Sequence, residues 1–408
     1  MRYISTRGGT PSVDFEGALF SGYAPDGGLF MPEEIPKLDR ETLKKWSTLS
    51  YPALVTELCS LFIDPALIPK KDLKGLIDRA FSRFRHRDIV HLSRMKNGLN
   101  VLELWHGVTY AFKDLSMSCT GQFLQYFLEK KQKHVTIVVG TSGDTGSSAI
   151  ESVRGAKNMD IIVLLPLGHC SKIQELQMTT VIEENVHVFG AGCIAQEMGL
   201  PIHLATVVNH NDIIHRTVQQ GDFSLLGNTT TTLASAMDIQ VPYNMERIFW
   251  LLSASDSGLI RTLMEQFDRT KNLCLPRELH AKISEKIDSQ SVSDEDIIQT
   301  MRRCWEENRY LLCPHSAVAV SYHYKQSALT SKQPSLPRCC LAPASAAKFQ
   351  DAVLQAQLVP EIPEDMQALE HMKTRCTPLR RGDDWTQVLR DKIENLSQQR
   401  KSGMNFQE

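Results

Sequence analysis

Residues 134–165 read HVTIVVGTSGDTGSSAIESVRGAKNMDIIVLL, and this stretch decides the fold class. Its two ends, residues 134–139 and 160–165, are apolar and rich in β-branched side chains, which is typical of buried parallel strands. Between them lies a turn of small polar residues followed by a helix, expected at about residues 147–155. A strand, a helix and a second strand in this order predict a parallel βαβ unit with a right-handed crossover.

The same alternation continues on both sides of this unit. Residues 100–104 and 186–189 have the composition of strands, and residues 113–130 and 171–182 have apolar positions at helical spacing. We therefore predict an α/β fold whose parallel sheet carries helices on both faces.

Outside this region the patterns are mainly helical. Helices are expected at residues 41–62, where Pro52 divides the segment in two, and at residues 248–267. A further helix at residues 294–310 begins after Ser293, a good capping residue, with acidic side chains in its first turn. The tail after residue 383 is polar and is expected to end in a frayed helix.

The chain length predicts more than one domain. The 408 residues exceed the roughly 100–200 residues of a usual domain. We expect an α-rich N-terminal domain over residues 1–95, an α/β domain over residues 96–350 and a helical tail over residues 351–408.

Composition and charge exclude several classes of protein. Lys and Arg total 45 against 47 Asp and Glu, so the net charge of −2 argues against a nucleic-acid partner. No apolar run reaches the ~18 residues of a membrane span, and the first residues lack the apolar core of a signal peptide. The ten cysteines are scattered without a CxxC pair, so we expect no metal site and a cytoplasmic location.

The segment His106–Asp114, HGVTYAFKD, places a lysine where a loop meets the start of a helix. A partly buried lysine beside the positive end of a helix loses some preference for its charged form, so a neutral amine becomes available. Nucleophilic and Schiff-base chemistry requires that neutral amine. The alternative is an ordinary Lys113–Asp114 pair at a helix start, which is a common structural feature.

The segment Gly140–Ser148, GTSGDTGSS, follows a predicted buried strand and precedes a helix. Its three glycines and five hydroxyl side chains favour a nest of backbone N–H groups that binds an anion. It lacks the Gly-Lys-Ser/Thr of a P-loop and the GxGxxG spacing of a dinucleotide fingerprint. A tight strand-to-helix connection without a ligand is the alternative.

Together these two segments resemble the threonine synthase family, whose patterns are HGPTxAFKD and TSGDTGSA. The resemblance extends over nearly the whole chain and is nearest to the threonine synthase-like proteins of animals. Further matching segments are residues 2–8, 24–32, 174–180, 209–216, 237–247 and 313–318.

The resemblance implies a fold type II enzyme, similar to tryptophan synthase β, that depends on pyridoxal 5′-phosphate (PLP). It implies that Lys113 holds the cofactor covalently and moves protons, and that Asp144 lies near the phenolic oxygen of the cofactor. It also implies that the loop at residues 141–145 binds the substrate carboxylate. The residues implied to contact substrate are Thr141, Ser142, Gly143, Thr145, Asn211, Asp212 and Arg216, with Arg216 facing the substrate phosphate.

The sequence departs from the family pattern in three places. The family's second glycine-rich loop, PTGxxGN, which binds the cofactor phosphate, is missing near Gly190, so the middle of the α/β domain is expected to be truncated. Pro343 stands where the family has a threonine that bonds the pyridine nitrogen, and Ser345 is the expected substitute. Val108 replaces the proline of HGPT, a minor change.

The resemblance implies a lyase that acts on a small phosphorylated amino acid, O-phosphohomoserine or O-phosphothreonine, and releases 2-oxobutyrate, ammonia and phosphate. Its activity is expected to be impaired in this shortened chain. Two alternatives stay open, which are threonine synthase activity and a catalytically silent scaffold that acts through protein partners. The patterns do not predict the oligomeric state.

Overall fold

A computed structural model describes residues 1–141, 143–165, 170–187, 204–329, 338–376 and 384–404 of the chain. Among these residues, no helix has both the length and the apolar character needed to cross a membrane. The predicted loss near Gly190 lies in residues 188–203 and therefore outside the described residues.

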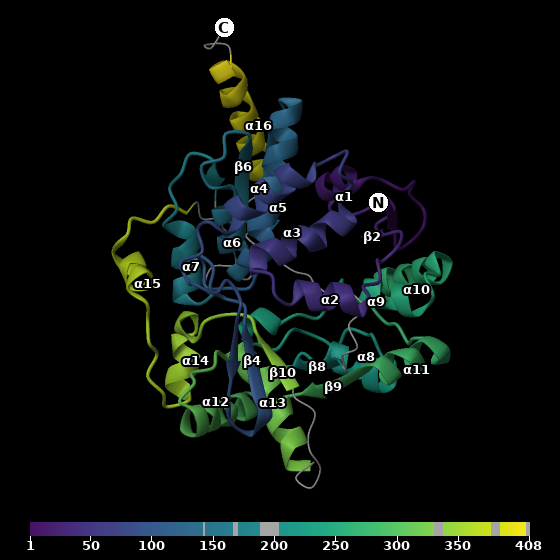
Figure 1. The fold of residues 1–408 in the computed structure, drawn as a ribbon, viewed down its shortest axis with the longest axis vertical. Helices are drawn as coiled ribbons and strands as arrows, with labels where there is room; N and C mark the ends of the chain where they lie inside the picture. Colours follow the sequence, from purple (N-terminus) through teal and green to yellow (C-terminus); the bar gives the residue numbers. More distant parts are fainter. Residues whose placement is uncertain (142, 166–169, 188–203, 330–337, 377–383, 405–408) are drawn as a thin grey trace.

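The N-terminal part is mainly helical and packs beside the central helices (Figure 1). A short antiparallel pair of strands opens the chain, and Pro52 sits in the first turn of α3, so the predicted division of the 41–62 segment is confirmed. The elements are β1 (Tyr3–Ser5), α1 (Phe15–Ser21), β2 (Phe30–Pro32), α2 (Arg40–Trp46), α3 (Tyr51–Phe62) and α4 (Lys70–Phe81).

The predicted βαβ unit is present as a parallel sheet in the order β5-β6-β7. Glycines allow its helices to approach closely, because a Cβ at Gly121 of α5 would lie 2.3 Å from the Ser152 carbonyl oxygen of α6. The elements are α5 (Lys113–Lys131), β5 (Val135–Gly140), α6 (Asp144–Val153), β6 (Met159–Leu164), α7 (Lys172–Thr179) and β7 (Val186–His187). Helix α6 begins at Asp144, three residues earlier than predicted.

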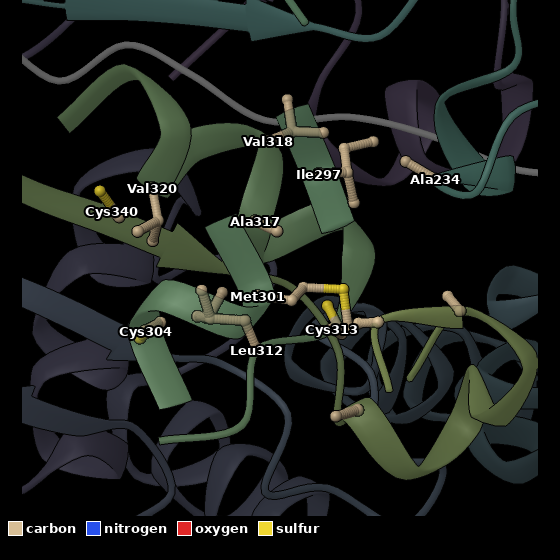
Figure 2. Packing of buried hydrophobic residues seen from close by; sticks show 14 of the residues in the cluster. Ala234, Ile297, Met301, Cys304, Leu312, Cys313, Ala317, Val318, Val320 and Cys340 are labelled. Carbon is tan, nitrogen blue, oxygen red and sulfur yellow. The ribbon is translucent and has the colours of Figure 1, made fainter. Parts of the chain in front are cut away.

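A second sheet joins distant parts of the chain in the order β10-β4-β3, with β10 parallel and β3 antiparallel to β4. Helices α12, α13 and α14 cover it through a core in which Met301, Leu312 and Ala317 meet (Figure 2). The elements are β3 (His91–Arg94), β4 (Leu99–Glu103), α12 (Asp294–Asn308), α13 (Pro314–Leu329), β10 (Arg338–Ala342) and α14 (Gln350–Gln355). The predicted cap at Ser293 is confirmed, and Ser293 forms a capping box with Asp296.

A third group of elements surrounds the parallel pair β8-β9. The helix predicted over residues 248–267 is wrong as a single helix, because Ala254 and Ser255 adopt left-handed backbone angles and Asp256 caps a new helix. The elements are β8 (Leu204–Val208), α8 (Ile213–Gln220), α9 (Met245–Leu252), α10 (Ser257–Thr270), α11 (Arg277–Lys286) and β9 (Ile287–Ser291).

The C-terminal tail ends in α16 (Trp385–Met404), after the short helix α15 (Glu364–Ala368). The helix expected in this tail is confirmed, and its contact with the sheet is an addition to the prediction, because α16 is anchored to the sheet of β6. Its Leu396 is only 5% exposed and packs with Ile162 and Leu164. Apolar residues at helical spacing, Leu389, Ile393 and Leu396, provide this contact.

Candidate active site

Lys113 is the first residue of α5, and the loop before it is fixed by the segment that follows β10. The Phe112 N–H donates to the Pro343 carbonyl over 2.7 Å, and the Ser345 N–H donates to the Tyr110 carbonyl over 3.1 Å. Tyr110 holds a left-handed φ of 58°, a conformation that costs a non-glycine residue free energy and is common at functional sites. These contacts set the direction in which Lys113 leaves the backbone.

Asp114, beside Lys113, ties the loop back onto the helix. Its carboxylate accepts from the Thr109 N–H and the Thr109 hydroxyl, each over 2.7 Å. Gly107 is required here, because a Cβ at this position would lie 2.3 Å from the Asp114 carboxylate. Burial raises the pKa of Asp114. Asp114 therefore has a structural role in holding the lysine loop.

The glycine-rich loop forms the strand-to-helix turn that the sequence predicts. The Thr141 hydroxyl accepts from the N–H groups of Gly143 and Gly146, each over 2.9 Å, and Gly143 has a φ of 136°. Among the described residues, the N–H groups of Asp144 and Thr145 have no acceptor at the start of α6. They are available to an anion, as expected at a helix N-terminus. Ser142 lies outside the described residues.

Asp144 is buried and forms an ion pair with a lysine from a distant part of the chain. The Lys348 Nζ lies 2.6 Å from Asp144 Oδ1 and donates to the Thr109 carbonyl over 2.7 Å. The Gln174 amide donates to the same carboxylate oxygen over 2.8 Å. Burial alone would raise the pKa of Asp144, but the charges of Lys348 and Lys113 and these hydrogen bonds lower it to about 2.

The structure therefore brings Lys113 and Asp144 together, with Lys348 joining the two loops that carry them. The Lys113 Nζ lies 4.6 Å from the centre of the Phe112 ring, and its charge acts on Asp144 and on His315. We call the place where Lys348 contacts Asp144 and the Thr109 carbonyl the lysine junction. Ser345 lies at this junction, where its hydroxyl accepts from the Ala347 N–H over 3.3 Å. An amine, an ionised carboxylate and free backbone donors thus meet at one place.

Two buried polar atoms at this junction have no hydrogen-bond partner among the described residues. They are His315 Nδ1 and Gln177 Oε1. Gln177 is tied to the lysine loop, because its amide donates to the Thr109 carbonyl over 3.1 Å. Buried polar groups in proteins are nearly always paired, so unpaired ones at a candidate site point to a ligand.

Asn211, Asp212 and Arg216 lie at the carboxyl end of β8 and in α8, and their contacts are within their own part of the fold. The Arg216 guanidinium pairs with Asp212 over 3.0 Å and with Asp222, and donates to the Ser224 carbonyl over 2.8 Å. Asn211 donates to the Thr230 carbonyl and to Asp238. The substrate-binding role of these three residues stays a prediction.

Lys348 and His315 belong to the site, although the two sequence motifs do not contain them. A signal for Lys348 was present in the sequence, since a single lysine within Ala346-Ala-Lys-Phe349 interrupts an apolar run. A fully buried lysine needs a paired acid. The identity of that acid is set by the fold, because Asp144 follows β5 and Lys348 follows β10, and these strands belong to different sheets.

Two solved structures share this architecture. The PLP-bound threonine synthase from Brucella melitensis matches with a TM-score of 0.86 and 28% identity, over 93% of this chain and 96% of that chain. Yeast threonine synthase matches with a TM-score of 0.87 and 29% identity, over 96% of this chain and 98% of that chain. The fold is therefore that of the fold type II enzymes.

Comparison of sequences identifies the family as well as the fold. The family models "Threonine synthase N terminus" and "Threonine synthase, C-terminal" match residues 2–81 and 316–390. The chain is 62% identical to human threonine synthase-like 2, over 98% of this chain and 99% of that protein, and 30% identical to Saccharomyces cerevisiae threonine synthase, over 96% and 97%. The chain belongs to the threonine synthase family.

The human alignment also bears on chain length. It runs over 479 positions, which is more than the 408 residues of this chain. The human protein therefore contains residues that have no counterpart here, although the two chains match almost from end to end.

Proposed function

We propose that this protein is a PLP-dependent lyase that acts on O-phosphothreonine or O-phosphohomoserine and works weakly in its shortened form. The observation that carries the proposal is the position of Lys113, at the start of α5, within electrostatic range of the ionised Asp144. A buried carboxylate with a low pKa beside an amine is typical of a catalytic centre.

The described residues fit the ring end of PLP. Lys113 would hold the cofactor covalently, while Asp144 and Ser345 would lie along the ring, as the resemblance implies. When bound, PLP supplies an electron-withdrawing ring that stabilises negative charge at the substrate Cα.

The chain's own residues would bind the substrate and move its protons. The free N–H groups of Asp144 and Thr145 would bind the substrate carboxylate. With O-phosphothreonine, the Lys113 amine would take the proton from Cα and the Cβ–O bond would break, with the electron pair leaving on the phosphate. With O-phosphohomoserine, Lys113 would take protons from Cα and Cβ, the Cγ–O bond would break with its electron pair leaving on the phosphate, and one proton would return to Cγ. The unsaturated amine that is released would take up one water molecule to give 2-oxobutyrate and ammonia.

The chain length supports weak activity. Several backbone N–H groups normally hold the cofactor phosphate, and each hydrogen bond to a charged group contributes roughly 1.5–3 kcal/mol. A chain without the PTGxxGN pattern loses this set of donors. The longer human alignment supports an internal loss, which we assign to the neighbourhood of Gly190.

A chemical trapping experiment tests the covalent step. The purified chain is mixed with PLP, reduced with borohydride and digested, and the modified lysine is identified by mass spectrometry. We expect substoichiometric labelling at Lys113 and loss of the label in Lys113→Ala. Mapping is needed because Lys348 is a second amine at the same junction. Labelling at Lys348 alone would contradict the proposal, and stoichiometric labelling at Lys113 with tight binding would contradict the predicted impairment.

Product analysis separates the alternatives. With O-phosphothreonine and O-phosphohomoserine, a lyase releases phosphate and 2-oxobutyrate together, whereas a threonine synthase converts O-phosphohomoserine to threonine. A silent scaffold releases neither product. A second chain, in which the corresponding human segment is inserted at Gly190, should bind PLP more tightly and release phosphate faster; equal inactivity of both chains would support the silent scaffold.

A further inference from the structure

His315 lies in the first turn of α13 and is held in place by the core beneath it. Cys313 and Ala317, on either side of it in sequence, point into the cluster that packs α12 and α13 against β10 (Figure 2). The His315 side chain is only 6% exposed, and its ring centre lies 4.5 Å from that of Phe349. Phe349 follows Lys348, so His315 belongs to the same junction.

The hydrogen bonding of His315 fixes its tautomer. The Ala236 backbone N–H donates to His315 Nε2 over 3.0 Å. A backbone N–H can only donate, so Nε2 must be the unprotonated acceptor nitrogen. The single proton of the neutral ring is therefore on Nδ1.

This Nδ1–H group is a buried donor that has no acceptor among the described residues. Leaving such a donor unpaired destabilises a fold, and a ligand that provides an acceptor would remove this cost. The charges of Asp144, Lys113 and Lys348 all act on this ring. The acceptor would thus be an atom that binds at the lysine junction.

We propose that His315 donates its Nδ1–H to an anionic oxygen of the ligand that binds between Lys113 and α13. The identity of this ligand rests on the proposed function, and its oxygen belongs either to the cofactor or to the phosphorylated amino acid. A neutral donor with a fixed tautomer recognises an anion at any pH at which the ring stays uncharged.

The protonation state of His315 supports this role. Burial, together with the positive charges of Lys113 and Lys348, lowers the pKa of His315 to about 4, against the opposing effect of Asp144. The ring therefore remains a neutral donor throughout the neutral pH range.

Two substitutions separate the donor from the structural contact. In His315→Asn the side-chain amide can place a donor near the position of Nδ1, but the acceptor for the Ala236 N–H is lost. In His315→Gln the amide oxygen can accept from Ala236, but no donor stands at the Nδ1 position. We expect His315→Gln to bind the ligand that supplies the oxygen, PLP or O-phospho-L-threonine, about 10–100-fold more weakly with little change in denaturation midpoint. We expect His315→Asn to show the reverse, a lower midpoint with affinity largely kept.

Nitrogen-15 NMR of histidine-labelled protein tests the donor directly, with the His315→Gln spectrum providing the assignment. The His315 ring should show the Nδ1–H tautomer between pH 6 and 8, and its Nδ1–H proton should shift when ligand binds. The probes are PLP, pyridoxal, O-phospho-L-threonine and inorganic phosphate. A shift with both PLP and pyridoxal assigns a ring oxygen of the cofactor, whereas a shift only with O-phospho-L-threonine assigns a substrate oxygen.

The outcomes separate this inference from the proposed function. An Nε2–H tautomer, unchanged affinity of His315→Gln for both PLP and O-phospho-L-threonine, or a resonance that none of the four probes shifts would each overturn the role of His315. If the PLP absorbance band is present while the resonance stays fixed, only the role of His315 fails. If inorganic phosphate shifts the resonance but no Lys113-linked band forms, the role of His315 stands and the proposed function fails.

Discussion

The lysine junction, where Lys348 joins the loop before α5 to the glycine-rich loop, is built very differently from the β5-β6-β7 sheet that carries the glycine-rich loop. At the junction, Lys348 is fully buried and joins Asp144 to the Thr109 carbonyl, so three distant segments meet through short polar contacts. In the β5-β6-β7 sheet, β7 has two described residues, and Val138 of the outer strand β5 is 47% exposed.

The difference indicates which part of the site would depend on the internal loss that we propose near Gly190. The part of the site that would hold the cofactor ring is fixed by contacts among described residues. The sheet that carries the glycine-rich loop is followed in the chain by residues 188–203, where we place the internal loss. Lys113, Asp144 and His315 can therefore keep their arrangement in a chain that binds the cofactor phosphate poorly. Substitutions at the lysine junction should therefore change the free energy of unfolding more than substitutions at the sheet.

The largest effect is expected from Lys348→Met, which keeps most of the side-chain volume but leaves the Asp144 carboxylate buried without its cation. Breaking a buried ion pair in this way destabilises a protein by about 3–5 kcal/mol. Chemical denaturation measures the change in the free energy of unfolding. Lys74→Met is the matched control, because Lys74 pairs with Asp78 on the exposed face of α4. Similar losses in the two variants would show that the junction is not held by this pair.

The next largest loss of stability is expected from a substitution in α16, the helix that packs on β6. Leu396→Ala should cost about 2–3 kcal/mol, because it opens a cavity between α16 and the face formed by Ile162 and Leu164. Limited proteolysis should then release the C-terminal segment earlier than in the wild-type chain. Val388→Ala, on the same helix but at a residue 37% exposed, is the control. An equally small cost for both substitutions would return α16 to the frayed helix that composition suggests.

Acid denaturation should report on the junction with a smaller effect. The folded pKa of Asp144 is lowered to about 2, below the value of about 3.9 for an unfolded aspartate, so its contribution is complete at neutral pH. That contribution is lost as the pH falls from about 4 towards 2, and about 1 kcal/mol should be lost between pH 5 and pH 3. Asp144→Asn should therefore lose less stability than the wild-type chain over this interval. Equal losses, measured by urea denaturation at the two pH values, would contradict the ionised state of Asp144.

The sequence predicts the local features of the fold well. The βαβ unit follows from the composition of residues 134–165, and the start of α12 follows from Ser293, because strands, helices and caps depend on neighbouring residues. The break between α9 and α10 is harder to predict, since Ala254 and Ser255 adopt left-handed angles without a glycine.

Contacts between distant segments were not predictable in the same way. The motifs identify Lys113 and Asp144 as a pair, but they do not identify Lys348 as the partner of Asp144 or Ala236 as the residue that fixes the His315 tautomer. These pairs form only when β10 and α13 fold beside the lysine loop. The motifs therefore predict which residues form the site. The ionised state of Asp144 and the tautomer of His315 depend on contacts that only the fold provides.

The smallest effect on stability is expected at the edge of the sheet. β5 pairs with β6 on one side, and Val138 is exposed on this strand among the described residues. Val138→Lys should change the free energy of unfolding by less than about 0.5 kcal/mol, as is usual for surface sites. It should nevertheless lower aggregation on light scattering, because a charge on an edge strand opposes pairing with another chain. Unchanged aggregation would show that this edge is already covered and would remove the contrast between the sheet and the junction.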